Sequence, residues 1–318
     1  MWPRFLLALT ILTALQGHAQ TYPSKPVRIV VPSSPGGASD LVSRIVATAL
    51  GERLGQPFVV ENRVTSGGLV ATQQVAEASP DGYTLLSTFD TFAINPYLFK
   101  GLKWDPVRDF APLMQVCRYP QVLLVHPSLG VKTLREFVAL AKEKGASLNY
   151  GSAGQASSSR LAYELFKDTA GIETVAIHYK GGGPAIQDLL SGQVQVMLIQ
   201  GGGAIPQYVK TGKLVALAVS SLERSKFYPE LPTIAETYPG FESESWVGMF
   251  APAATPRPAV EQLHSSLSAT LADPSVRSRL ESQGCDVVGG PAEALAARVR
   301  SDQAKWSRII RDKNITVQ

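Results

Sequence analysis

The sequence has few of the residues from which metal and redox sites are built. Of its 318 residues, two are cysteines and four are histidines, and none has a spacing typical of a metal site. Lysine and arginine are scattered, without the basic runs and interleaved aromatics of nucleic-acid-binding proteins. We therefore expect no metal, no other cofactor and no nucleic-acid partner, and take the net charge of +4 as a mild bias toward anionic ligands.

Motifs for phosphate binding and for catalysis are missing as well. There is no Gly-x-x-x-x-Gly-Lys-Ser/Thr, no Gly-x-Gly-x-x-Gly after the first expected strand, and no Gly-x-Ser-x-Gly around Ser152. His126 and His178 lie in no strong catalytic motif. We therefore expect a non-catalytic protein without catalytic residues. Because triad residues need not be close in sequence, a secreted serine hydrolase that uses a serine near residue 152 stays the alternative.

Long apolar runs are absent except at the start, where the pattern is typical of an export signal. Arg4 precedes an apolar run over residues 5–15, and Gly17-His18-Ala19 has the small-x-small form of a cleavage site. A run of about eleven residues is too short to span a bilayer. We expect a signal peptide over residues 1–19 that is cleaved after export to the periplasm.

Export places Cys117 and Cys285 in an oxidising compartment, where a disulfide can form. Because they are far apart in sequence, they could pair only if the fold brought their Cα atoms within about 7 Å. We expect two separate buried thiols instead.

Short β-branched runs alternate with amphipathic segments from residue 22 onward, which is typical of repeated βαβ units. Two lobes are predicted, a discontinuous lobe 1 over residues 22–116 and 245–318 and an inserted lobe 2 over residues 117–244. Two chain crossings between them would form a hinge with a cleft. Strands are predicted over residues 27–31, 58–60, 83–87, 122–125, 148–150, 174–177, 194–199, 214–219 and 246–250.

Five Gly/Ser-rich turns separate a predicted strand from a predicted helix, at residues 33–40, 65–68, 151–158, 181–184 and 201–203. In open α/β sheets such turns line the crevice at the carboxyl ends of the strands, where ligands bind. Each helix start offers unpaired N–H groups and a partial positive charge. Several of them converging on one cleft would bind an anion without needing arginine or lysine.

A set of motifs in a fixed order resembles one family along the whole mature chain. They are Tyr22-Pro23-Ser24-Lys25-Pro26, Pro35-Gly36-Gly37, Glu61-Asn62-Arg63, Pro80-Asp81-Gly82-Tyr83, Asn149-Tyr150-Gly151-Ser152-Ala153-Gly154, Tyr179-Lys180-Gly181-Gly182 and Asp188-Leu189-Leu190. The chain resembles the substrate-binding proteins of tripartite tricarboxylate transporters, the Bordetella uptake-gene type of extracytoplasmic receptor. The resemblance implies an α/β, two-lobed type II periplasmic binding protein fold.

The resemblance also implies a function. Such a receptor closes over a di- or tricarboxylate, an acidic amino acid or an aromatic acid, and delivers it to the permease subunits of a tripartite membrane transporter. We expect a monomer. A ligand-dependent sensor partner is a third possibility.

The resemblance also implies which positions of this sequence contact the ligand. They lie in the first loop, in the second loop, after the third strand and in the inserted lobe, at Gly36, Gly37, Ala38, Ser39, Ser66, Gly67, Thr88, Ser152, Ala153 and Ser157.

The chain departs from the family pattern at several positions. Ser33-Ser34 replaces a usual Phe-Pro, and Ile199 with Gln200 stands where the family commonly has an aspartate, so that a polar contact at Gln200 is an open question. Arg160 replaces a common histidine and is either a clamp for a distal carboxylate or a solvated side chain. Asp90 either pairs with a ligand ammonium group or only caps the helix that begins at Thr91, and we favour the cap.

Overall fold

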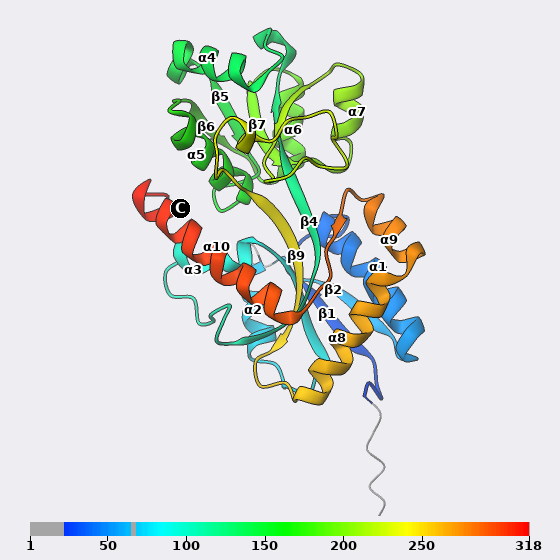
Figure 1. Cartoon of the computed structure of the whole chain (residues 1–318). Coiled ribbons are helices and arrows are strands. Elements are labelled where there is room, and N and C mark those ends of the chain that lie inside the picture. Colours follow the sequence, from blue (N-terminus) through cyan, green and yellow to red (C-terminus); the bar gives the residue numbers. More distant parts are fainter. Residues whose placement is uncertain (1–21, 65–67, 318) are drawn as a thin grey trace, which may run out of the picture.

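The computed structural model describes residues 22–64 and 68–317. Figure 1 shows two lobes joined by two long strands, β4 (Phe110–Val125) and β9 (Glu244–Pro252). The strands pair antiparallel from Phe110 to Pro120, and the rest of β4 continues into the other lobe. The two-lobed α/β fold expected from the sequence is confirmed.

The lower lobe in Figure 1 holds a mixed sheet in the order β2-β1-β3-β9-β4, with β10 added on β4. Strand β1 pairs parallel with β2 and β3, as βαβ units require. The other strands of this lobe are β1 (Val27–Val31), β2 (Phe58–Asn62), β3 (Thr84–Phe89) and β10 (Asp286–Val287). Its helices are α1 (Ala38–Leu54), α2 (Leu69–Ala76), α3 (Thr91–Leu98), α8 (Arg257–Ala272), α9 (Pro274–Glu281) and α10 (Ala292–Asp312).

In the upper lobe, the second half of β4 pairs antiparallel with β7 and β8, and β5 pairs parallel with β6 and β7. The strands are β5 (Asn149–Ser152), β6 (Val175–His178), β7 (Val196–Gln200) and β8 (Val215–Val219). The helices are α4 (Leu134–Lys144), α5 (Ser158–Ala170), α6 (Gly182–Leu190) and α7 (Ile205–Lys210), with 3-10 turns at Pro127–Leu129, Gly145–Ser147 and Ile234–Glu236.

Local sequence signals account for several boundaries. Helix α1 ends at Gly55, whose φ of 69° suits a residue without a side chain. Helix α4 begins with a capping box in which Thr133 and Glu136 bond to each other's backbone, as the sequence indicates. Strand β1 is almost entirely β-branched and largely buried.

Each lobe has its own hydrophobic core, and a smaller cluster joins the two lobes. In that cluster Ile94 of α3 and Trp306 of α10 pack with Leu161 of α5, together with Ile315 after α10. The apolar stripe predicted for the last helix is core, as expected, because Leu295, Val299, Trp306, Ile309 and Ile310 are all buried.

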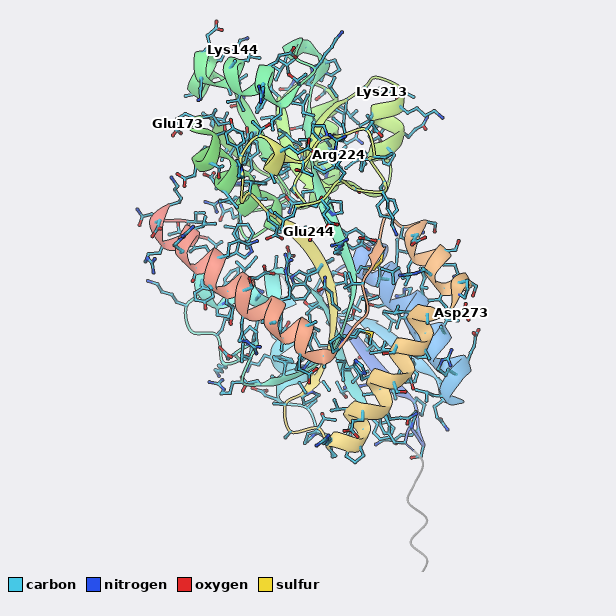
Figure 2. The ribbon with its side chains drawn as sticks, in the orientation of Figure 1. Lys144, Glu173, Lys213, Arg224, Glu244 and Asp273 are labelled. Atoms are coloured by element: carbon cyan, nitrogen blue, oxygen red, sulfur yellow. A yellow bond between two sulfur atoms is a disulfide. The ribbon has the colours of Figure 1, made fainter. Side chains whose placement is uncertain are left out.

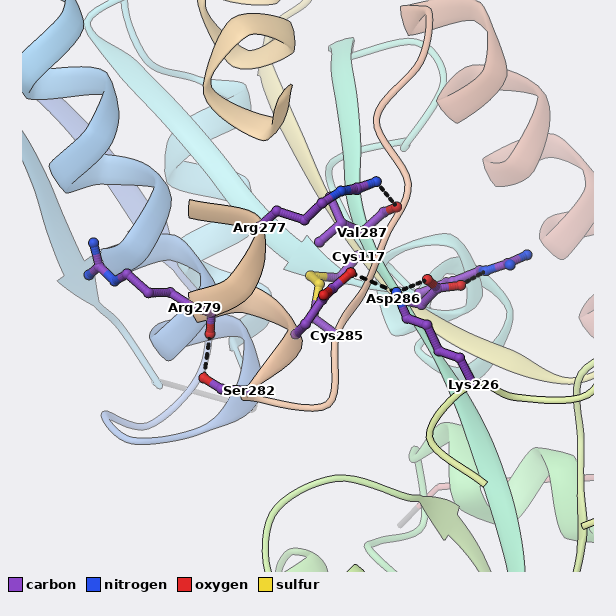
Figure 3. Close-up of a disulfide and its surroundings, with 10 residues drawn as sticks. Cys117, Lys226, Arg277, Arg279, Ser282, Cys285, Asp286 and Val287 are labelled. Carbon is purple, nitrogen blue, oxygen red and sulfur yellow. Dashed lines mark hydrogen bonds and ion pairs between the residues drawn. A yellow bond between two sulfur atoms is a disulfide. The ribbon is translucent and has the colours of Figure 1, made fainter. Parts of the chain in front are cut away.

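The prediction of two separate thiols is wrong. Cys117 of β4 and Cys285, just before β10, form a disulfide with Cα atoms 5.3 Å apart. Figure 3 shows the bond where the loop after α9 meets β4. The antiparallel pairing of β10 with β4 brings the two residues together despite 168 residues of separation.

The lobe boundaries at residues 116/117 and 244/245 stay a prediction, as does the signal over residues 1–19, which lies outside the described residues. Within residues 22–64 and 68–317, no helix combines the length and apolar character needed to cross a membrane.

Candidate functional site

A cavity of about 200 Å³ lies between the lobes. The lower lobe and β9 contribute Phe89, Asp90, Thr91 and Ser245, and the upper lobe contributes the rest. Among the described residues, the upper-lobe lining is Gln121, Ala153, Ser157, Ser158, Ser159, Gly182, Ile199 and Gln200. This space can hold several water molecules, which suits a small organic molecule.

Three helices begin at this cavity. Helix α3 begins at Thr91, α5 at Ser158 and α6 at Gly182. Their first N–H groups have no partner within the helix, and the helix dipoles add positive potential there. The Gly/Ser-rich turns before α5 and α6 therefore converge as expected, and the start of α3, which follows no such turn, joins them; this arrangement favours an anionic ligand.

Serines order the start of α5. The hydroxyl of Ser157 donates to the carbonyl of Gly154 at 2.7 Å and accepts from the backbone N–H of Arg160 at 3.3 Å. The hydroxyl of Ser159 accepts from the N–H of Ala153 at 2.9 Å and lies 2.9 Å from that of Ser157. This network fixes the turn before any ligand arrives.

Asp90 caps α3 as favoured from the sequence, since its Oδ1 accepts from the N–H of Thr91 at 3.0 Å. Its carboxyl group is buried, and burial together with nearby Asp302 raises its pKa to about 7. Asp90 also lines the cavity. A contact with a ligand ammonium group stays a prediction.

Arg160 binds the chain's own backbone. Its Nη1 donates to the carbonyl of Gln155 at 2.9 Å and to that of Thr316 at 3.0 Å. The side chain is half-buried rather than fully solvated, and Arg160 is not one of the described residues that line the cavity. A carboxylate clamp at Arg160 stays a prediction, and it would have to compete with these two carbonyl groups.

Ser152 lies at the end of β5 and is fully buried. Its Oγ is 2.7 Å from Nδ1 of His178, and burial together with the charge of Arg160 lowers the pKa of that imidazole. This is the serine–histidine contact that a hydrolase needs, yet Ser152 is not among the described residues of the cavity lining. The buried hydroxyl is a poor nucleophile for a substrate held in the cleft.

The first loop is held by its own side chains. The N–H of Gly36 donates to Oδ2 of Asp40 at 2.8 Å, and the hydroxyl of Ser39 lies 2.8 Å from that of Ser33. Among the described residues, neither Gly36, Gly37, Ala38, Ser39 nor Thr88 lines the cavity. Ser66 and Gly67 lie outside the described residues. Ligand contacts at all of these positions stay predictions.

Of the predicted site residues, the cavity brings together Asp90, Ala153, Ser157 and Gln200. Sequence reasoning missed Gln121 and Ser245, which lie on the two crossing strands. Gln121 could have been found from the sequence, because it is a polar residue directly before the apolar run 122–125 of an expected buried strand.

Two further cavities adjoin the crossing strands. One, of about 490 Å³, is lined by charged residues, but each of its cations has a carboxylate partner. The pairs are Arg118–Asp286, Arg224–Glu236, Lys226–Glu281 and Arg298–Glu242. Figure 2 shows Glu244 of this lining where the lobes meet, with Arg224 in the lobe above. The other, of about 130 Å³, is lined by the predicted turn at residues 201–203.

The two lobes, the crossing strands and the cleft define a periplasmic-binding-protein type of receptor. Residues 42–315 match the model of the tripartite tricarboxylate transporter family receptor. The chain belongs to this family.

Solved structures and a curated relative agree with this assignment. The periplasmic binding protein BugD is 35% identical with a TM-score of 0.80, covering 93% of this chain and all of BugD. BugT of Bordetella pertussis is 31% identical over 97% of each chain.

Two similar structures contain small acids. One is R. palustris Rpa4515 with adipate, at 32% identity and a TM-score of 0.83, covering 93% of this chain and 99% of that one. The other is MatC from Rhodopseudomonas palustris with bound malate, at 32% identity and a TM-score of 0.78, covering 91% of this chain and all of that one. The family model is that of a receptor, and a further similar structure is a TctC solute binding protein from Polaromonas, at 28% identity and a TM-score of 0.79.

Proposed function

We propose that this chain is an exported periplasmic receptor that captures a small carboxylate between its lobes and delivers it to the permease subunits of a tripartite tricarboxylate-type transporter. Di- and tricarboxylates, acidic amino acids and aromatic acids are the candidate ligands. The receptor acts as a monomer and catalyses no reaction.

One observation supports this proposal above the others. The starts of α3, α5 and α6 converge on one interlobe cavity, where N–H groups and hydroxyls replace charged side chains as anion ligands. Adipate and malate in two similar structures support a carboxylate as that anion. Ligand contacts from both lobes would favour the closed arrangement, which a permease could recognise.

A thermal-shift titration of the mature protein against mono-, di- and tricarboxylates, acidic amino acids and aromatic acids tests the proposal. A ligand at about a hundred times its dissociation constant should add roughly 2.7 kcal/mol to the free energy of unfolding. Ser157→Ala should weaken every acid that binds, whereas Ser265→Ala, on an exposed position of α8, should not. No shift with any acid, in protein shown to be ligand-free, would reject carboxylate capture.

The hydrolase alternative has one observation in its favour, the contact between Ser152 and His178. It predicts turnover of 4-nitrophenyl esters that Ser152→Ala abolishes. We expect no such turnover because the hydroxyl of Ser152 is buried.

A further inference from the structure

Gln121 is the one cavity-lining side chain whose amide nitrogen and amide oxygen are both buried without a hydrogen-bond partner in the described part of the chain. Only 1% of Gln121 is exposed. Unpartnered buried amides are rare in folded proteins because each lost hydrogen bond to water is uncompensated. A buried amide at the wall of a ligand cavity is therefore best explained by a group that arrives with the ligand.

The position of Gln121 is rigid. Its backbone N–H donates to Oγ of Ser220 at 2.8 Å, and its carbonyl accepts from the N–H of Ser220 at 2.8 Å. It lies on β4, one of the two strands that cross between the lobes. The amide is consequently held at the base of the cleft rather than on a mobile loop.

Gln200 stands directly opposite Gln121 in the antiparallel pairing of β4 with β7. Residues in such cross-strand pairs project from the same face of the sheet, about 5 Å apart, and both line the cavity. Nε2 of Gln200 donates to Oγ of Ser245 at 2.7 Å. No described residue donates to the amide oxygen of Gln200. This oxygen can therefore accept a hydrogen bond from a ligand.

The two amides together offer N–H donors from Gln121 and carbonyl acceptors from both residues. A second ligand carboxylate would satisfy the donors but bring its oxygens against two amide oxygens and the carboxyl group of Asp90. An ammonium group would satisfy the acceptors and leave the N–H groups of Gln121 unpaired. A carboxamide or a hydroxyl group both donates and accepts, and so satisfies both sides.

We propose that Gln121 and Gln200 form a second subsite that binds a neutral donor–acceptor group, so that the preferred ligand is a carboxylate carrying a carboxamide or a hydroxyl group. The inference rests on the proposed function, since the helix starts of α5 and α6 are taken to hold the carboxylate end. It assigns to Gln121 a role in specificity, not in the capture of the carboxylate.

Isothermal titration calorimetry on the mature protein tests this inference. The ligands are acids that share one carboxylate and differ only in the group at the opposite end of the carbon chain. The short series is succinate, succinamate, 4-hydroxybutyrate and 4-aminobutyrate, and the long series is adipate, adipamate, 6-hydroxyhexanoate and 6-aminohexanoate. In at least one series, the amide or hydroxy acid should bind about ten-fold tighter than both the dicarboxylate and the amino acid.

Gln121→Met, which keeps the length of the side chain, should reduce that preference to less than about three-fold. It should leave the melting temperature of the ligand-free protein unchanged or higher, because it removes an unpaired buried amide. Gln115→Met, elsewhere on β4 and outside the cavity lining, is the matched control and should keep the preference.

The outcomes separate the two proposals. If acids of either series bind but the dicarboxylate or the amino acid is preferred, or Gln121→Met leaves the ranking intact, carboxylate capture stands and the amide subsite is overturned. If no acid of either series binds, the amide subsite is overturned, and carboxylate capture is decided by the thermal-shift panel, which also contains tricarboxylates and aromatic acids.

Discussion

Trp246 donates a hydrogen bond from its indole nitrogen to Oδ2 of Asp302 at 2.6 Å, and both side chains are buried. Trp246 lies on the crossing strand β9 and Asp302 on α10. Arg298 donates to the same oxygen at 3.1 Å, so the carboxylate is satisfied from two elements. This contact attaches the last helix to one of the two strands that join the lobes.

Asp302→Leu should lower the free energy of unfolding by about 1–3 kcal/mol, because it leaves the buried indole N–H of Trp246 without a partner and takes from Arg298 one of its carboxylates, while Glu242 remains. Urea unfolding measures the loss. Asp312→Leu, which removes an exposed carboxylate paired with Arg311 at the end of the same helix, should change stability by less than about 1 kcal/mol. Similar losses in both variants would contradict the role given to Asp302.

Asp90→Asn should change the pH dependence of stability. The folded protein raises the pKa of Asp90 to about 7 by burial and by the charge of Asp302, which outweigh Arg298 on α10, Ser245 on β9 and the N–H of Thr91. The folded state therefore holds a proton between about pH 4 and 7 that the unfolded state releases, and stability falls as the pH rises through this window.

Asparagine keeps the cap on α3 and cannot ionise. The melting temperature of Asp90→Asn minus that of the wild type should therefore rise from pH 4 to pH 7 and level off above. A difference that stays constant over this range would show that Asp90 has an ordinary pKa.

Removal of the disulfide should destabilise the ligand-free protein by about 2–5 kcal/mol, because the bond closes a loop of 168 residues in the unfolded chain. The double variant Cys117→Ala/Cys285→Ala, compared with the oxidised wild type by denaturant unfolding, gives the value. Thiol titration of the unfolded, unreduced wild type should find no free thiol. Two titratable thiols would mean that the bond is absent.

Gly68→Ala should destabilise the protein by at least about 2 kcal/mol. A Cβ atom at Gly68 would lie 2.4 Å from Cβ of Pro32, in addition to the strain of a φ of 86°. Gly101→Ala is the matched control, because its φ of 80° is similar and no atom lies within 4 Å of the added carbon. Thermal melts that show equal losses would rule out the contact with Pro32 as the cause.

The alternation of strands and helices could be predicted because each signal is local. The capping box at Thr133 and the stop at Gly55 depend on residues within one turn of the helix end. The same holds for the Gly/Ser-rich turns, of which those before α5 and α6 reach the cleft.

The first half of β4 escaped prediction because it contains Pro112 and Pro120, residues that usually interrupt strands. The strand forms nonetheless, and its pairing with β9 shifts register between Pro112 and Met114, an irregularity of the kind at which sheets tolerate proline. The disulfide and the pairing of Gln121 with Gln200 could likewise not be predicted from the sequence, because both depend on which strands become neighbours in the sheet.

The residues after α10 form a third link between the lobes, besides β4 and β9. Arg160 of the upper lobe holds the carbonyl of Thr316, Lys313 pairs with Asp168 at 2.5 Å, and Ile315 packs beside Leu161. If one lobe rotates relative to the other about the crossing strands, the end of α10 must therefore either move together with the upper lobe or lose these contacts. In the proposed receptor, the angle through which the cleft opens is thus set partly at the edge of the molecule, by residues 313–317, which are not among the described residues that line the cavity.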